Sequence, residues 1–291
     1  MDRGVAMHRS LRNALISLAT AALLGACAGL SADRRAAAAA GHHAYALEGR
    51  GKPTVVFQSG LGDGAGVWER VYAQTGKTTA ALAYDRYGYG GSSAAEGARD
   101  PCSIAREQRE FLRAAGVAPP YLLVGHSLGG LYQYVYARLY PEDVAGLVLL
   151  DPTHPEHWRR MQGEAPGMAA TLRGMRLLFD TAMRREFDDQ SACLDRLPAA
   201  NGTHPPVRLL VRSNFPLTER GGFEAMVRAL QRDWQRLTGA DRIEQVAGSG
   251  HYIQRERPEA VSAAVEDLVR QFRAARAQRR MRRDGQRAGK G

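Results

Sequence analysis

The stretch YLLVGHSLGGLYQYVY, residues 121–136, places a serine between glycines where the hydrophobic pattern changes. Its first four residues form an apolar run typical of a buried strand, whereas the apolar spacing from Leu131 onward is helical. A serine on a sharp strand-to-helix turn adopts strained backbone angles, and its neighbours must lack bulky side chains. Gly125 and Gly129 meet that requirement. We therefore expect Ser127 to be exposed at a helix N-terminus, where free amides favour negative charge.

Apolar runs alternate with helical segments on both sides of this turn. Strands are expected within residues 42–49, 53–60, 80–84, 144–151, 206–213 and 242–248, and helices at 103–115, around 233–237 and near the C-terminus. The first two strands are expected to pair through the turn RGK. Strands that alternate with helices indicate an α/β fold with a mainly parallel, doubly wound sheet.

The formal net charge of +10 is concentrated at the ends of the chain. Residues 271–291 hold eight Arg or Lys beside one Asp, a net +7, and residues 1–26 hold three Arg beside one Asp, a net +2. About +1 remains for the rest, so no basic groove for nucleic acid is indicated. We expect residues 273–291 to be a basic, disordered tail, with contact to anionic lipid or another polyanion as the alternative.

The N-terminus has the pattern of an export signal. Arginines precede the apolar stretch ALISLATAALLGA, which is too short to span a bilayer comfortably and ends at small residues. Residues 24–27, Leu-Gly-Ala-Cys, resemble a bacterial lipobox, in which Cys27 would carry lipid. The favoured prediction is a cell-envelope lipoprotein with a signal over residues 1–27 and an Ala-rich tether over 28–42. Cleavage without lipidation, which would give a periplasmic or secreted protein, is the alternative.

Export changes the interpretation of the two remaining cysteines, Cys102 and Cys193. An even number of cysteines in an oxidising compartment is compatible with a disulfide that closes a long loop. Two separately buried thiols are equally compatible with the sequence.

Two glycine-rich stretches partly resemble nucleotide-binding motifs. GLGDGAG, residues 60–66, follows a predicted strand, but no register gives Gly-x-Gly-x-x-Gly. TGKTT, residues 75–79, lacks the glycine that a phosphate-binding loop needs five places before Gly76. We therefore predict no cofactor.

A serine hydroxyl becomes a good nucleophile only when a base takes its proton. Seven of the eight histidines lie in the signal, in or next to the expected tether, beside the serine or in the interrupting segment 152–205: His8, His42, His43, His126, His154, His157 and His204. His251 instead follows the last predicted strand, in the loop AGSGHYIQ. We predict that His251 is the base.

These residues resemble the α/β-hydrolase superfamily, on its serine esterase and lipase side. The segments VVFQSGLGDGAGVW, YDRYGYGGSS, LLVGHSLGG, GLVLLDPTHPE and GSGHYIQRERPEAV occur in that family's order and cover about residues 43–272. The resemblance implies a Ser-acid-His set and an oxyanion hole made by the backbone N–H groups of Leu128 and Leu61. It also implies that Asp85 and Arg86 brace loops. Where the family often has His-Gly, this chain has Ser59-Gly60.

The acid of the set has two candidates. The family most often carries it after the strand that follows the insertion, but no carboxylate follows that strand until Glu219. Asp151 ends the strand after the serine's helix, a position from which some lipases of the family draw their acid. Both strand ends open on one edge of the sheet. We predict Asp151, with Glu219 as the alternative.

Residues 152–205 fall where such hydrolases carry a lid. Apolar residues recur there at helical spacing: Met168, Leu172, Met175, Phe179, Met183 and Phe187. An apolar roof over the pocket favours an apolar acyl or aromatic ester as substrate. The predicted protein is an exported serine hydrolase that cleaves carboxylic esters, with the membrane contacted through its lipid. The alternative is a non-catalytic hydrolase-fold module that binds an apolar ligand or partner at the envelope.

Overall fold

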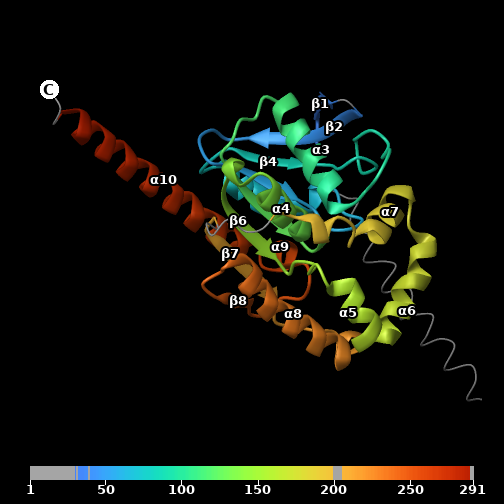
Figure 1. Cartoon of the computed structure of the whole chain (residues 1–291). Coiled ribbons are helices and arrows are strands. Elements are labelled where there is room, and N and C mark those ends of the chain that lie inside the picture. The colour runs from blue at the N-terminus through green and yellow to red at the C-terminus, as the bar shows by residue number, and fades with distance from the viewer. Residues whose placement is uncertain (1–29, 31, 39, 199–204, 289–291) are drawn as a thin grey trace, which may run out of the picture.

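The computed structural model describes residues 30, 32–38, 40–198 and 205–288, whose eight strands form one sheet (Figure 1). The strands are β1 (Arg34–Ala38), β2 (Gly41–Glu48), β3 (Thr54–Gln58), β4 (Ala81–Tyr84), β5 (Tyr121–His126), β6 (Val144–Leu150), β7 (Val207–Arg212) and β8 (Ile243–Val246). Their order across the sheet is β1-β2-β4-β3-β5-β6-β7-β8. The β1–β2 and β2–β4 pairs are antiparallel and the others are parallel. The predicted mainly parallel sheet is confirmed.

Helices cover both faces of this sheet. They are α2 (Glu69–Gly76), α3 (Pro101–Ala114), α4 (Leu128–Leu139), α5 (His157–Glu164), α6 (Pro166–Met175), α7 (Thr181–Asp189), α8 (Gly222–Thr238), α9 (Ile253–Glu256) and α10 (Pro258–Ala288). Helices α3, α4 and α8 contribute to one apolar cluster, and α2, α9 and α10 contribute to a second. All six residues of β5 are buried, as expected of a strand covered on both faces. The doubly wound architecture is confirmed.

The edge of the sheet formed by the first strands of the chain differs from the prediction. The segment expected to be a tether over residues 28–42 contains β1, which pairs with β2, and the first residues of β2 itself. The expected pairing of the first two domain strands is also wrong, because β4 lies between β2 and β3. Every residue of β3 and β4 is buried, so both are interior strands with neighbours on each side. The antiparallel strands β2 and β1 cover that edge.

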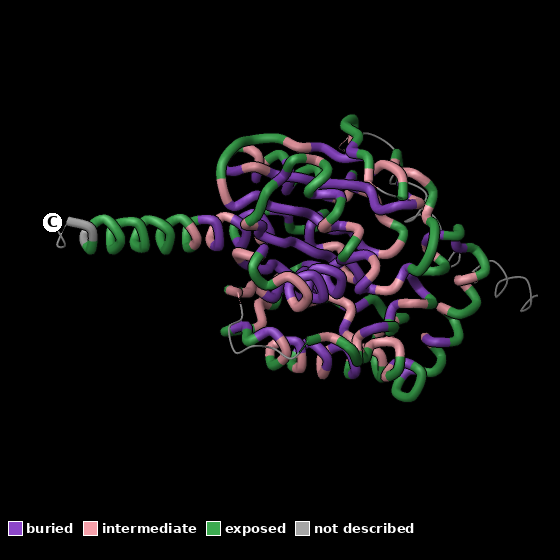
Figure 2. Tube along the Cα trace, turned by 45° about the horizontal axis from the view of Figure 1, so that its top comes forward, coloured by how far each residue is buried: buried purple, intermediate pink, exposed green. Residues whose placement is uncertain are grey.

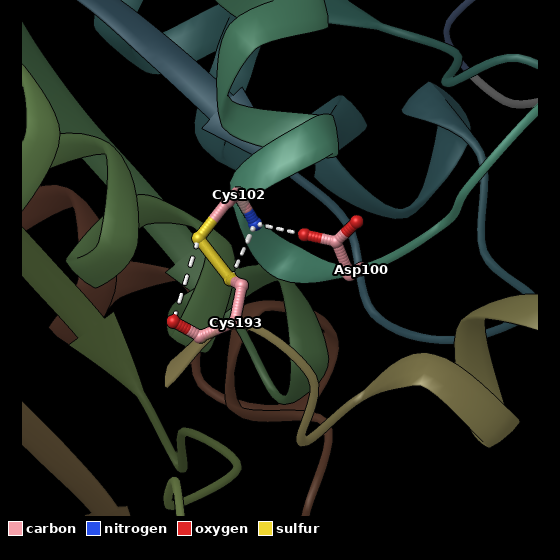
Figure 3. Close-up of side chains that lie close together, drawn as sticks. All are labelled: Asp100, Cys102 and Cys193. Carbon is pink, nitrogen blue, oxygen red and sulfur yellow. Dashed lines mark hydrogen bonds between the residues drawn. A yellow bond between two sulfur atoms is a disulfide. The ribbon is translucent and has the colours of Figure 1, made fainter. Parts of the chain in front are cut away.

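Helices α5, α6 and α7 form the insertion between β6 and β7, and one disulfide fastens its far end to the body (Figure 3). Cys193 follows α7 and is bonded to Cys102 at the start of α3, with their Cα atoms 6.3 Å apart. Asp100 lies beside this pair and caps α3 by accepting from the N–H groups of Cys102 and Ser103. This capping accounts for the cluster of Asp100 with the two cysteines, whose bonded sulfurs are not thiolate ligands.

Helix α10 extends beyond the body of the molecule. It continues to Ala288, so the residues predicted as a disordered tail are helical up to that point. Arg, Ala, Gln and Met dominate this stretch and have high helix propensity. Figures 1 and 2 show this helix projecting from the body, and its residues 273–284 are exposed. Among the described helices, none combines the length and apolar character needed to cross a membrane.

Candidate active site

Ser127 lies on the turn between β5 and α4, with backbone angles of φ 54° and ψ −123°. Its glycine neighbours are required by close packing. A Cβ on Gly125 would come within 2.5 Å of the Gly129 carbonyl oxygen, and one on Gly129 within 2.3 Å of the Gln58 carbonyl oxygen. Real Cβ atoms essentially never approach so closely. The Ser127 N–H donates to the Leu150 carbonyl over 3.0 Å, which fixes the turn to β6.

His251 and Asp151 meet although they are 100 residues apart in the chain. The Nδ1 atom of His251 lies 2.6 Å from Oδ2 of Asp151. Asp151 directly follows β6, has φ 40°, and donates its N–H to the Leu210 carbonyl. A carboxylate only accepts, so this contact requires the hydrogen on Nδ1 and leaves Nε2 as an acceptor. That tautomer can take a proton from a serine hydroxyl.

Arg212 ends β7 and joins both candidate acids. Its Nε donates to Oδ2 of Asp151 and its Nη1 to Oε2 of Glu219, each over 2.5 Å. Its Nη2 lies 2.9 Å from Nδ1 of His251. The other oxygen of Asp151 accepts from Gln231 over 3.3 Å. The structure therefore places Asp151 in contact with the imidazole of His251. Glu219 is hydrogen-bonded to Arg212 instead and not to the imidazole.

The charge of Asp151 is maintained by these partners. Burial by itself would raise the pKa of this carboxyl. The guanidinium of Arg212 and the hydrogen bond from His251 outweigh burial, and they hold the pKa of Asp151 well below its usual range. An ionised carboxylate beside Nδ1 stabilises an imidazolium when it forms.

Two backbone amides lie where an oxyanion hole is expected. Leu128 is the first residue of α4, and first-turn N–H groups have no partner within their helix. A Cβ on Gly60 would lie 3.2 Å from Cβ of Ser127, so the peptide from Gly60 to Leu61 passes beside the serine. Within the described ranges, no acceptor is found for the Leu61 N–H. Both amides remain available to a developing oxyanion.

Ser127 and His251 line one cavity of about 250 Å³ together with Asp151 and Arg212. Apolar side chains of the insertion and α8 form much of its wall: Met161, Met168, Leu172, Phe223, Val227, Leu230 and Trp234. From the predicted apolar stripe only Met168 and Leu172 reach this wall. The stripe is broken because α6 ends at Met175 and Asp180 caps the separate helix α7.

The other described histidines have different environments. His126 is fully buried and donates from Nε2 to the His251 carbonyl over 2.9 Å, which holds the loop of His251. His154 contacts Asp233, and His43 lies within β2 and contacts the Asp85 carbonyl. His157 lines the cavity, and burial lowers its pKa to about 4, so it is neutral there at pH 7. His8 and His204 lie outside the described residues, as does Cys27.

Sequence reasoning missed Arg212 and Gln231. Arg212 has a visible signal, because it is an arginine at the end of the apolar strand VRLLVR, which is buried over its last four residues. Such a charge requires a partner. Gln231 has no comparable signal, since a glutamine on an amphipathic helix is ordinary.

The chain is similar to known proteins in sequence and in structure. A model of the "Alpha/beta hydrolase family" matches residues 55–264. Over 240 residues the chain is 27% identical to the "Uncharacterized protein YqjL" of Bacillus subtilis (strain 168), covering 78% of this chain and 87% of that protein. Over 108 residues it is 32% identical to the (Lyso)-N-acylphosphatidylethanolamine lipase of Mus musculus, covering 36% of this chain and 32% of that protein.

Among solved structures, a thermophilic esterase from Thermogutta terrifontis, described as malate bound, is similar with a TM-score of 0.58. The two sequences are 19% identical, and the match covers 82% of this chain and 98% of that chain. This likeness shows a shared fold.

Proposed function

The chain belongs to the α/β hydrolase family and is a hydrolase, and on this premise we propose that it cleaves carboxylic esters through an acyl-enzyme on Ser127. The observation that carries the proposal is the 2.6 Å contact between His251 and Asp151 at the cavity that Ser127 also lines. A serine, a base with a free Nε2 and an ionised carboxylate are the components of nucleophilic acyl transfer.

In the proposed mechanism, Oγ of Ser127 attacks the ester carbonyl while Nε2 of His251 takes its proton. Asp151 stabilises the imidazolium, and the N–H groups of Leu128 and Leu61 bind the oxyanion. The imidazolium then protonates the departing alcohol, which leaves an acyl-serine. Water activated by His251 hydrolyses that ester and restores the serine.

The apolar cavity wall supports the substrate class that we propose. Its apolar methionine, leucine and aromatic side chains suit an apolar acyl or aromatic group, and a lipase and an esterase are among the similar proteins. We propose that the insertion acts as the lid of this cavity. We also propose that the protein is exported and carries lipid on Cys27.

Covalent labelling by a fluorophosphonate tests the proposal, together with turnover of p-nitrophenyl butyrate. Wild-type protein should show both, and Ser127→Ala should show neither because it lacks the attacking oxygen. Ser191→Ala is the matched control, since Ser191 is exposed, lies beyond α7 and does not line the cavity, so the substitution should leave labelling unchanged. Equal labelling of Ser127→Ala and wild type would refute the assignment. Wild-type protein that neither labels nor turns over would favour the non-catalytic binding module.

A further inference from the structure

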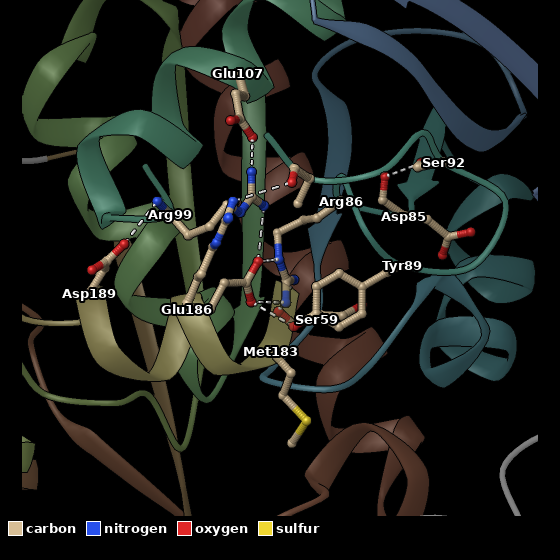
Figure 4. A network of polar contacts seen from close by, with 12 residues as sticks. Ser59, Asp85, Arg86, Tyr89, Ser92, Arg99, Glu107, Met183, Glu186 and Asp189 are labelled. Carbon is tan, nitrogen blue, oxygen red and sulfur yellow. Dashed lines mark hydrogen bonds and ion pairs between the residues drawn. The ribbon is translucent and has the colours of Figure 1, made fainter. Parts of the chain in front are cut away.

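A buried arginine holds the loop that contains Leu61. Arg86 follows β4 and is 2% exposed. Its Nη1 donates to the Ser59 carbonyl over 2.7 Å (Figure 4). Its Nη2 donates to the Gly60 carbonyl over 2.8 Å. One rigid guanidinium therefore binds two consecutive peptide oxygens.

This contact determines which way the Leu61 amide points. The Gly60 carbonyl and the Leu61 N–H belong to the same peptide unit, which is trans. In a planar trans peptide the carbonyl and the N–H point in opposite directions. Since the carbonyl is directed at Arg86, the N–H is directed away from it. Gly60 lies against Ser127, so a fixed peptide plane fixes the donor beside the nucleophile.

Arg86 is itself held by a residue of the insertion. Glu186 on α7 accepts from Nε of Arg86 over 2.9 Å and from Nη2 over 2.8 Å. It also accepts from Tyr89 and from Arg99, and its side chain is fully buried (Figure 4). Burial opposes the charges of Arg86 and Glu186, but their attraction outweighs it, so the pKa of Glu186 lies below its usual value and that of Arg86 above.

We propose that Arg86, oriented by Glu186, is a positioning residue that aims the Leu61 N–H into the oxyanion hole. The inserted helix α7 thereby supplies part of the catalytic apparatus without contacting the substrate. This inference rests on the proposed function, because an oxyanion must form at Ser127. It extends the structural role that the family resemblance implies for Arg86.

The test compares transition-state stabilisation with folding. Arg86→Lys replaces the planar guanidinium, which binds two carbonyls at once, by a single ammonium group. Glu186→Gln removes the negative charge that orients Arg86. Both variants should lose about 10- to 100-fold in kcat, since an oxyanion donor contributes about 10²–10³-fold and a misaimed one keeps part of that. KM for p-nitrophenyl butyrate should change much less. The affinity of an alkyl boronic acid, which forms a tetrahedral adduct on serine, should fall with kcat.

Arg99→Gln is the matched control. It removes the other guanidinium on Glu186 but has no contact with Ser59 or Gly60. It should lower the melting temperature while boronic acid affinity stays within about threefold. Folded Arg86→Lys or Glu186→Gln with wild-type kcat and boronic acid affinity would overturn the inference, as would an equal loss in Arg99→Gln. If Arg86→Lys does not fold, Glu186→Gln decides. Failure of the proposed function would give a different result from failure of this inference, because wild-type protein would then show no turnover and no fluorophosphonate labelling.

Discussion

At Asp151, partners from a strand, a helix and the loop after β8 converge on one carboxylate. His251 and Arg212 share Oδ2, and Gln231 donates to Oδ1. Burying an ionised carboxylate with only one of these partners would destabilise the fold, whereas several charge-assisted hydrogen bonds stabilise its ionised form. Glu219 lies on the far side of Arg212 and partly balances the positive charge that Arg212 brings close to the imidazole. Asp151, Arg212, Glu219 and Gln231 together set the electrostatic environment of His251, the proposed base.

The assignment of the acid is tested by a pair of isosteric variants. Asp151→Asn should lower kcat by about 10³–10⁴-fold, because an amide no longer enforces the Nδ1–H tautomer. Glu219→Gln should keep most of the activity, since Glu219 reaches Arg212 and not the imidazole. Ester turnover is measured beside circular dichroism, which checks the fold. Near wild-type turnover by Asp151→Asn, with an inactive Glu219→Gln, would identify Glu219 as the acid.

At the scale of elements, the insertion packs through α5 and α6 against α8, and two further contacts join its α7 end to the body. Glu186 of α7 is buried among the side chains of Arg86 and Arg99, and Cys193 beyond α7 is bonded to Cys102. In contrast, Leu177 and Leu178, between α6 and α7, are 75% and 85% exposed. The part of the insertion next to the oxyanion loop is therefore anchored, whereas the two leucines between α6 and α7 are left exposed.

The disulfide should contribute measurably to stability. It joins residues 91 positions apart, and closing a loop of this length restricts the unfolded chain. Reduction should lower the free energy of unfolding by about 2–5 kcal/mol. Urea unfolding with and without reductant measures this difference. A Cys102→Ala/Cys193→Ala double variant should already have the lower stability and show no response to reductant. Wild-type protein that is unaffected by complete reduction would contradict the prediction.

For the whole molecule, charge and catalytic site are spatially separate. The cavity lies beside the insertion and α8, whereas the arginines that give the chain its excess positive charge are numerous on the projecting end of α10. Within the described part of that helix, Arg273 makes the last hydrogen bonds to the body, to the carbonyls of Lys52 and Thr78. The exposed turns beyond it add charge without adding to the core.

Attachment of the molecule to a membrane is predicted from its N-terminal sequence. If Leu-Gly-Ala-Cys acts as a lipobox, the mature protein begins at a lipid-modified Cys27. Mass spectrometry of the N-terminal peptide after expression in a bacterial host should then show an acylated cysteine. Cys27→Ala should abolish the modification and release the protein from the membrane fraction. An unmodified N-terminal peptide that starts beyond Cys27 would refute lipidation.

The sequence by itself determined the parallel core of the sheet and the positions of Ser127, His251 and Asp151 at loop ends. These features are local, because a buried strand, a glycine-flanked turn and a strand-end carboxylate each have a pattern within a few residues. The interior position of β4, the strand β1 and the break between α6 and α7 were not predictable in this way. They depend on which neighbour each segment packs against.

Only the tertiary structure decided how the charged residues pair. The sequence favours Asp151 over Glu219 as the acid but does not show what either carboxylate contacts, and Arg212 comes to bind both only once β6 and β7 are adjacent. Likewise, Arg86 and Glu186 are 100 residues apart and meet only because α7 folds back over the loop at Gly60. A buried charge must find an opposite charge wherever the fold brings one, and that partner leaves no periodic pattern in the sequence.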